Sequence, residues 1–274
     1  MPLPLNPTLR HRLQESDRPL FGGWVCSGSP VMAEVMAGSG LDWILLDMEH
    51  APNGLESVLS QLHAVSGYPV TAVVRVPSAD PVIIKQVLDL GAQTILVPMV
   101  STEEQARSVA AAAQYPPHGI RGVGSALARS ARWNRVPDYL ENAAEHVSVF
   151  VQVETGEGVE NARAIAAVDG IDGVFVGPSD LAASLGFLGR QGHPEVVAAV
   201  GRAFADVTAA GKPVGVNAFD PQAAADYAEA GATFLLVGAD VALTARASEA
   251  LAARFIPQPG AGEDDGVSRA TASY

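Results

Sequence analysis

The sequence has one cysteine, two lysines and no long apolar run. Because Cys26 is the only cysteine among 274 residues, no internal disulfide can form, which favours a reducing compartment. No apolar run approaches the roughly 20 residues needed to span a bilayer, and residues 1–20 lack the apolar segment of a signal peptide. Acidic side chains outnumber basic ones by 30 to 17, which disfavours nucleic acid as a partner. We therefore expect a cytoplasmic globular protein that binds neither nucleic acid nor a membrane.

Short apolar segments alternate with alanine-rich segments along almost the whole chain. The short segments are apolar on both faces, which is typical of strands in a buried parallel sheet. The alanine-rich segments have apolar residues three or four positions apart, which is typical of helices. The predicted strands are Phe21–Cys26, Asp42–Asp47, Val70–Val76, Thr94–Val97, Val147–Val153, Gly173–Val176, Val214–Val216 and Thr233–Val237. The predicted helices include Ser29–Ala37, Leu55–Val65, Thr102–Ala113, Gly158–Ala167, Pro221–Ala230 and Asp240–Phe255.

Eight strand–helix units predict an α/β fold, a (β/α)8 TIM barrel, over residues 21–256. Four of the strands follow a glycine that ends a helix, and this weak internal repeat supports the prediction. An open doubly wound sheet is the alternative, but no Gly-x-Gly-x-x-Gly follows the first strand and no Gly-x-x-x-x-Gly-Lys-Ser/Thr occurs. Residues 1–20 are predicted to be an N-terminal extension, and 257–274 a flexible tail rich in Gly, Asp and Ser.

Polar side chains end four of the predicted strands, on the side of a barrel where active sites lie. The four segments are Asp47–His50, Arg75, Gln152–Glu154 and Gly177–Asp180. Glu154 and Asp180 follow neighbouring strands, which lie roughly 4.8 Å apart, so their carboxylates are placed to share one cation. Two carboxylates, completed by water and substrate oxygens, suit Mg²⁺ or Mn²⁺. The alternatives are an exposed loop acid for Glu154 and a helix N-cap for Asp180.

His50 and Arg75 are the candidates for proton transfer and charge stabilisation. His50 follows two acids at a strand end, which suits a group that moves protons near neutral pH, and a hydrogen-bonded structural histidine is the alternative. Arg75 ends a buried strand, where a guanidinium pairs with a carboxylate or a developing oxyanion. Its alternative is an ion pair with Asp47 or Glu49. The segment Gly177–Asp180 indicates a helix start that either binds an anion or is a purely structural cap.

Neither lysine is placed for Schiff-base chemistry, which needs a lysine inside the site. Lys85 is predicted to lie in the helix after the third strand. Lys212 precedes Pro213 at the start of the seventh strand, which is the end of a barrel away from catalysis. The sequence therefore favours metal-assisted chemistry over a lysine adduct.

A series of motifs runs in order from about residue 20 to residue 255. They are Gly22-Gly23-Trp24, Ala37-Gly-x-Gly-x-Asp-Trp43, Asp47-x-Glu-His-Ala-Pro-Asn53, Val73-Val-Arg75, Ile84-Lys-Gln-x-Leu-Asp89-x-Gly91, Leu96-Val-Pro-Met99, Gly119-Ile-Arg-Gly-Val-Gly124, Ala131-Arg-Trp-Asn-Arg135, Val151-Gln-Val-Glu154, Gly173-Val-Phe-Val-Gly-Pro-Ser-Asp180 and Leu251-Ala-Ala-Arg-Phe255. Together they resemble the HpcH/HpaI family of metal-dependent pyruvate aldolases. The combination is far more specific than any single motif.

The resemblance implies a role for each of the matching residues. His50 is the acid/base, Arg75 stabilises the enolate and the carbonyl oxygen, and Asp89 raises the basicity of the histidine. Glu154 and Asp180 are the metal ligands. The residues implied to contact the pyruvyl group are Trp24, Gln152, Gly177, Pro178, Ser179 and Asp180.

The resemblance also implies a reaction and an assembly. The enzyme would use Mg²⁺, Mn²⁺ or Co²⁺ to cleave 4-hydroxy-2-oxo acids, such as 4-hydroxy-2-oxoheptane-1,7-dioate, reversibly into pyruvate and an aldehyde such as succinic semialdehyde. A metal-stabilised pyruvate enolate would be the intermediate. Family members of this kind form homo-trimers or homo-hexamers in which the last helix packs on a neighbouring subunit.

Three other functions remain open at this point. A 2-keto-3-deoxy-sugar-acid aldolase of the same family would use the same site with a polyol substrate. A citrate-lyase-type enzyme acting on a CoA thioester would want a basic groove, which an acidic chain with two lysines does not suggest. A catalytically silent barrel would bind keto acids without turnover.

Overall fold

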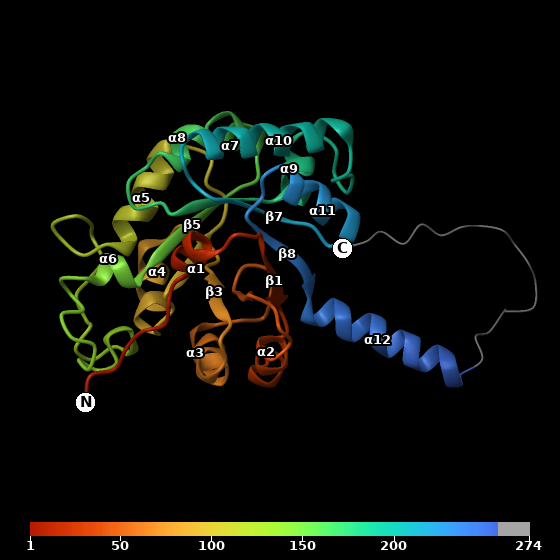
Figure 1. The fold of residues 1–274 in the computed structure, drawn as a ribbon. Coiled ribbons are helices and arrows are strands. Elements are labelled where there is room, and N and C mark those ends of the chain that lie inside the picture. Colours follow the sequence, from red (N-terminus) through yellow and green to blue (C-terminus); the bar gives the residue numbers. More distant parts are fainter. Residues whose placement is uncertain (257–274) are drawn as a thin grey trace, which may run out of the picture.

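The predicted strands form a closed, all-parallel barrel in a computed structural model that describes residues 1–256 (Figure 1). The strands are β1 (Leu20–Val25), β2 (Trp43–Asp47), β3 (Thr71–Arg75), β4 (Thr94–Val97), β5 (Ser148–Val153), β6 (Gly173–Val176), β7 (Val214–Asn217) and β8 (Phe234–Ala239). Each pairs with the next along the chain, and β8 closes the ring by pairing with β1. The TIM barrel is therefore confirmed, with every strand end within two residues of its predicted position.

Helices surround the barrel and connect its strands. They are α1 (Leu9–Glu15), α2 (Pro30–Ala37), α3 (Leu55–Ala64), α4 (Pro81–Asp89), α5 (Glu103–Ala113), α6 (Ala143–His146), α7 (Gly156–Glu160), α8 (Ala162–Ala166), α9 (Pro178–Ser184), α10 (Pro194–Ala209), α11 (Pro221–Glu229) and α12 (Asp240–Phe255), with 3-10 turns η1 (Val65–Gly67) and η2 (Arg129–Ala131). The helix predicted over Gly158–Ala167 is two helices, which meet at Asn161. The sixteen-residue α10 was absent from the predicted helices, although its buried residues have helical spacing.

Successive residues of each strand face two different cores. Leu45 points into the barrel, where it packs in one cluster with Trp43, whereas Ile44 and Leu46 pack in the outer cluster under the helices. Inside the barrel the ring of Phe234 contacts the rings of Trp43 and Phe150, with centroids 5.9 and 5.1 Å apart. The centre of the barrel is therefore filled, and polar side chains gather above this aromatic layer.

The two terminal helices differ in how they meet the barrel. α1 lies within the predicted extension 1–20 and covers the N-terminal end of the strands, where buried Leu9 joins the inner cluster and its N–H donates to Thr94 Oγ1 at 3.1 Å. α12 extends away from the barrel (Figure 1).

Within residues 1–256, no helix has both the length and the apolar character required to cross a membrane. The predicted tail 257–274 lies outside the described residues.

Candidate active site

A buried ion pair joins the ends of β2 and β3. Asp47 and Arg75 are register partners on these neighbouring strands, and both are buried. Arg75 donates from Nε and Nη2 to the two carboxylate oxygens of Asp47, at 2.8 Å each. Its Nη1 lies 2.7 Å from Glu49 Oε2. The ion pair that the sequence left as an alternative for Arg75 therefore exists, and it involves both acids.

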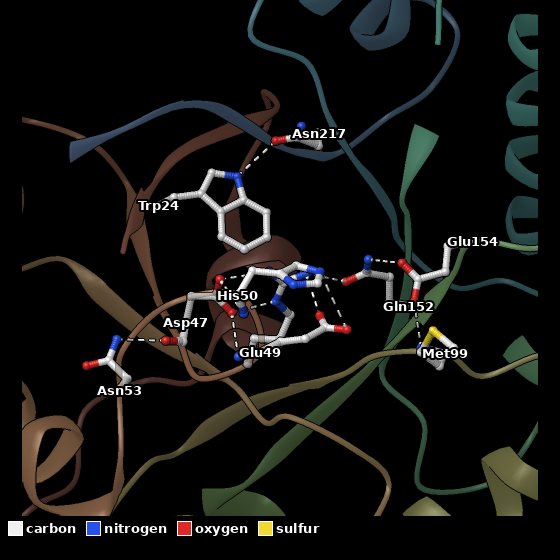
Figure 2. A network of polar contacts seen from close by, with 10 residues as sticks. Trp24, Asp47, Glu49, His50, Asn53, Met99, Gln152, Glu154 and Asn217 are labelled. Carbon is white, nitrogen blue, oxygen red and sulfur yellow. Dashed lines mark hydrogen bonds and ion pairs between the residues drawn. The ribbon is translucent and has the colours of Figure 1, made fainter. Parts of the chain in front are cut away.

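The turn after β2 is held by the same carboxylate. Asp47 accepts hydrogen bonds from the backbone N–H groups of Glu49 and His50, at 3.0 and 3.3 Å, and Asn53 donates to the Asp47 carbonyl at 2.7 Å (Figure 2). These bonds leave the His50 side chain 67% exposed in the pocket. Its Nε2 lies 3.8 Å from Glu49 Oε1. The motif Asp-x-Glu-His-Ala-Pro-Asn thus fixes where the histidine is presented.

Glu49 was considered in the sequence as an acid before His50 and as an alternative partner for Arg75, but was not among the predicted site residues. The carboxylate lies between Arg75 and His50 and is largely buried, with 13% of its side chain exposed. Burial raises the pKa of Glu49, while the charge of Arg75 opposes the shift. An acid directly before a histidine at a strand end was the available signal.

Trp24 and Asn217 close the side of the pocket next to Arg75. The Arg75 guanidinium lies over the Trp24 ring, 4.3 Å from the centroid. The Trp24 indole N–H donates to Asn217 Oδ1 at 2.9 Å (Figure 2). Asn217 was not predicted, although it is the polar residue that ends β7. This stacking and hydrogen bond fix the face that the indole presents to the guanidinium.

Glu154 lies on the opposite side of the cluster, beyond Gln152 (Figure 2). It is 2% exposed, and accepts hydrogen bonds from Gln152 Nε2 and from the backbone N–H of Met99, the latter at 2.7 Å. Burial first, and then repulsion from Glu49 and Asp180, raises the pKa of Glu154 to about 7. The alternative of an exposed loop acid is therefore wrong for Glu154.

The segment after β6 begins α9, as its sequence predicted. Gly177 is the N-cap and Pro178 the first helical residue, so Asp180 lies in the first turn and is not the N-cap. A Cβ at Gly177 would lie 2.9 Å from both Gln152 Nε2 and Glu154 Oε2, so only glycine leaves room for this pair. Ser179 Oγ donates to Gln191 Oε1 at 2.8 Å. The contact of this turn with a pyruvyl group stays a prediction.

One cavity of about 410 Å³ brings most of the predicted residues together. Its lining includes every predicted site residue except Glu154 and Asp89, namely Trp24, His50, Arg75, Gln152, Gly177, Pro178, Ser179 and Asp180. Asn217 and Gln191 line it as well. Glu154 lies directly behind this wall, in contact with Gln152. The cavity is therefore the candidate active site.

Asp89 is not part of this cavity. It ends α4, whose chain direction returns it to the N-terminal side of the barrel, away from the strand end that carries His50. Its carboxylate accepts a hydrogen bond from Arg121 Nη2 at 2.8 Å. Within this chain the structure does not bring Asp89 to His50, and the implied effect of Asp89 on the histidine stays a prediction.

The carboxylates of the site fit a divalent cation with two protein ligands. Within residues 1–256 no group of three or more His, Cys, Asp or Glu side chains is arranged to hold a metal ion. The prediction that Glu154 and Asp180 are two protein ligands, with water and substrate oxygens completing the shell, stays a prediction. The fit rests on Glu154, a buried carboxylate that repels its acidic neighbours and forms no ion pair in the described part of the chain.

Comparison with known proteins agrees with this geometry. Residues 20–247 match the family model described as HpcH/HpaI aldolase/citrate lyase. The chain belongs to the HpcH/HpaI aldolase/citrate lyase family. A curated relative from Salmonella dublin, named 4-hydroxy-2-oxo-heptane-1,7-dioate aldolase, is 52% identical over 241 residues, which cover 88% of this chain and 92% of the relative.

Two solved structures are similar to this chain over most of its length. An HpcH/HpaI aldolase/citrate lyase family protein from Burkholderia cenocepacia J2315 is 42% identical with a TM-score of 0.86, covering 90% of this chain and 98% of that chain. The citrate synthase SbnG is 29% identical with a TM-score of 0.80, covering 90% and 96%. The resemblance inferred from the motifs is thereby confirmed.

Proposed function

We propose that this HpcH/HpaI family enzyme is a divalent-metal-dependent aldolase. It reversibly cleaves 4-hydroxy-2-oxo acids, such as 4-hydroxy-2-oxoheptane-1,7-dioate, into pyruvate and an aldehyde such as succinic semialdehyde. The 52% identity with the Salmonella dublin relative supports this substrate class. The single cysteine supports action in the cytoplasm.

The observation that carries the proposal is the buried Glu154 carboxylate beside a pocket that offers His50 and Arg75. No lysine lines the cavity. Lys212 Nζ instead donates to the Ile171 carbonyl at 2.6 Å, and Lys85 lies in α4. With no amine at hand for a Schiff base, a cation at Glu154 and Asp180 is the electrophile that this site can supply.

Each side chain of the pocket has a task in this reaction. When bound, a divalent cation at Glu154 and Asp180 supplies Lewis-acid stabilisation of charge on the keto acid. His50, exposed in the pocket, takes the proton of the C4 hydroxyl as the C3–C4 bond breaks, and Glu49 holds its ring nearby. Arg75, fixed by Asp47 and Glu49, meets the developing enolate charge. A proton added to the enolate carbon then gives pyruvate. In the reverse direction pyruvate loses this proton, the enolate carbon adds to the aldehyde, and His50 returns the hydroxyl proton.

The direct test is pyruvate release from a synthetic 4-hydroxy-2-oxo acid, before and after metal removal with EDTA. Activity should vanish in the chelated enzyme and return with Mg²⁺, Mn²⁺ or Co²⁺. Undiminished turnover in chelator would reject the metal mechanism. Borohydride trapping of a pyruvate adduct would reject it independently, because it would show a lysine intermediate.

The choice of aldehyde is tested in the synthetic direction. Pyruvate is offered with succinic semialdehyde, glyceraldehyde or tartronate semialdehyde, and the values of kcat/KM are compared. The highest value should belong to succinic semialdehyde. A preference for either hydroxyaldehyde would identify a sugar-acid aldolase, and metal binding with no turnover on any of them would identify a silent barrel.

The enzyme is proposed to be a homo-trimer or homo-hexamer in which α12 packs on a second copy. Asp240 is the buried residue of α12, and the helix with its C-cap exposes several large apolar side chains after it. They are Val241, Leu243, Leu251, Phe255 and Ile256, which are 45–78% exposed. Light scattering should find a trimer or hexamer, and Leu243→Glu with Leu251→Glu should reduce it to monomers. A monomeric wild-type protein would reject the assembly.

A further inference from the structure

A second cavity lies at the opposite end of the barrel from the active site. Its floor includes Thr71 and Thr94, the first residues of β3 and β4. Arg12 of α1 and the arginines Arg129 and Arg132 at η2 also line it. The cavity measures about 120 Å³, which is room for several water-sized groups. Of the Ala131–Arg135 motif, Arg132 lines this cavity.

The wall of this basal cavity carries positive charge without any acid. Three arginines line it and no Asp or Glu does, although the chain has 30 acids and 17 basic residues. Within residues 1–256 none of Arg12, Arg129 and Arg132 forms an ion pair, whereas other arginines, such as Arg10 and Arg18, do. Like charges held close together repel each other. A negative ion that binds between these arginines would relieve this repulsion, so the cluster favours anion binding.

The three arginines donate hydrogen bonds to backbone carbonyl groups, which carry no full negative charge. Arg129 donates to the carbonyls of Leu90 and Leu62, at 2.9 and 3.4 Å, which belong to the C-terminal ends of α4 and α3. Arg12 donates to a single carbonyl at 2.9 Å, and Arg132 donates to that of Arg129 at 2.6 Å. Helix capping thus explains the position of Arg129. The charge of Arg12 lowers the pKa of Asp42, whereas Arg132 forms no ion pair within residues 1–256 and meets no acid along the cavity wall.

The guanidinium groups of Arg129 and Arg132 converge on one point. A Cβ at Gly91 would lie 2.7 Å from Arg129 Nη1 and 2.9 Å from Arg132 Nη1, so the glycine lets both approach the backbone. Burial and then the charge of Arg132 lower the pKa of Arg129 to about 10. The pKa of nearby His63 is lowered too, by burial and then by both arginines. Positive charge in this cluster therefore lowers the pKa values of neighbouring basic groups.

We propose that this basal cavity binds a small tetrahedral dianion of the phosphate type. The charges of Arg129 and Arg132, which form no ion pair within residues 1–256, match the two negative charges of such an ion, and planar guanidinium groups donate in pairs to its oxygens. Several converging donors suit a tetrahedral arrangement of oxygens better than a planar carboxylate. The site is independent of the aldolase reaction, because it lies at the other end of the strands.

The experiment measures the melting temperature of the full-length protein at constant ionic strength, as chloride is replaced by inorganic phosphate and, in parallel, by sulfate. Wild type should show a saturable rise of about 5 °C at an anion concentration 100 times Kd. Arg132→Gln should abolish the saturable part. Arg202→Gln, which changes an exposed arginine on α10, should keep it.

A second variant keeps the test independent of folding defects. Arg12→Gln changes a different element of the same wall and should also remove the saturable rise. No saturation in the wild type, or an equal rise in wild type and Arg132→Gln, would overturn the proposal and leave the arginines as helix caps. Because the readout is anion-dependent melting, failure here leaves the aldolase proposal untouched.

Discussion

The two halves of the active-site pocket balance buried charge differently. At the ends of β2 and β3, the Asp47 carboxylate meets the Arg75 guanidinium through two hydrogen bonds of 2.8 Å. At the ends of β5 and β6, Glu154 is equally buried but has Glu49 and Asp180 as its charged neighbours, and its pKa rises to about 7. Asp47 ends β2, and Glu154 directly follows β5. Asp47 has its counter-charge on the neighbouring strand, whereas Glu154 forms no ion pair in the described part of the chain.

Under the proposed function, this difference separates a supporting carboxylate, Asp47, from a proposed metal ligand, Glu154. A buried carboxylate that is paired and hydrogen-bonded fixes its surroundings, as Asp47 does for the turn that presents His50. A buried carboxylate without a cation is costly unless something binds it. Glu154 is kept in place by Gln152 and by the N–H of Met99, whose backbone has a φ of 60°. Such backbone strain is tolerated where function requires it.

The strongest test of the comparison is Glu154→Gln. The amide keeps the shape but removes a metal ligand, so kcat/KM for pyruvate release should fall by roughly 10³-fold or more. The melting temperature in EDTA should stay equal or rise, because an unpaired buried charge is gone. Glu157→Gln, an exposed acid on α7, should change neither quantity. A large loss of stability in Glu154→Gln would show that its charge is already compensated.

His50→Ala should have the next largest effect. Turnover should fall by roughly 10²–10⁴-fold, as expected for a positioned acid/base. Stability should not change, because the ring is 67% exposed and the turn is held through the backbone N–H of residue 50. The control is His118→Ala in the exposed loop after α5. If the Mg²⁺ dependence collapses along with turnover, His50 is a metal ligand and its assignment as acid/base is wrong.

Asp47→Asn tests the side of the pocket where Asp47 is paired with Arg75. Its main effect should be on the stability of the fold. Removing one partner leaves the buried Arg75 guanidinium with Glu49 alone, which should lower the free energy of unfolding by about 3 kcal/mol. Urea unfolding in the presence of EDTA measures this free energy. The control is Asp169→Asn, which changes an exposed aspartate. An unchanged stability would mean that Glu49 alone compensates Arg75, and the contrast between the halves would disappear.

The barrel and most of the pocket were predictable because they depend on local patterns. Strands buried on both faces are continuous apolar runs, and parallel strands bring their carboxyl ends to one side of the barrel. Polar residues that end such runs, among them Arg75, Glu154 and Asp180, must therefore converge. The likeness to the aldolase family then followed from motifs in the right order, which the match over residues 20–247 confirms.

The details that were missed depend on register and on side-chain packing. Whether Arg75 pairs with Asp47, Glu49 or both follows from the alignment of β2 with β3, which the sequence does not state. Asn217 becomes a site residue only because the Trp24 indole reaches it across the barrel. Asp89 lies next to Arg121 because a helix returns the chain to the other end of the barrel. The order of motifs along the chain does not reveal at which end of the barrel each motif lies.

The smallest expected effect concerns Cys26, whose thiol responds to the charge on the β2–β3 side. Burial first, and then the charges of Asp47 and Asp240, raises the pKa of Cys26 to about 12, against the opposing charge of Arg75. Only the thiolate reacts, so the rate of alkylation by iodoacetamide should rise about tenfold per pH unit from pH 8 to pH 10 without levelling. Glutathione in the same tube should level off, because an ordinary thiol has a pKa of about 8.5. Asp47→Asn, checked to be folded, should react faster at pH 8 because one repelling charge is gone. A plateau below pH 9 in the wild type would mean that the Asp47 side of the pocket is less anionic than its contacts indicate.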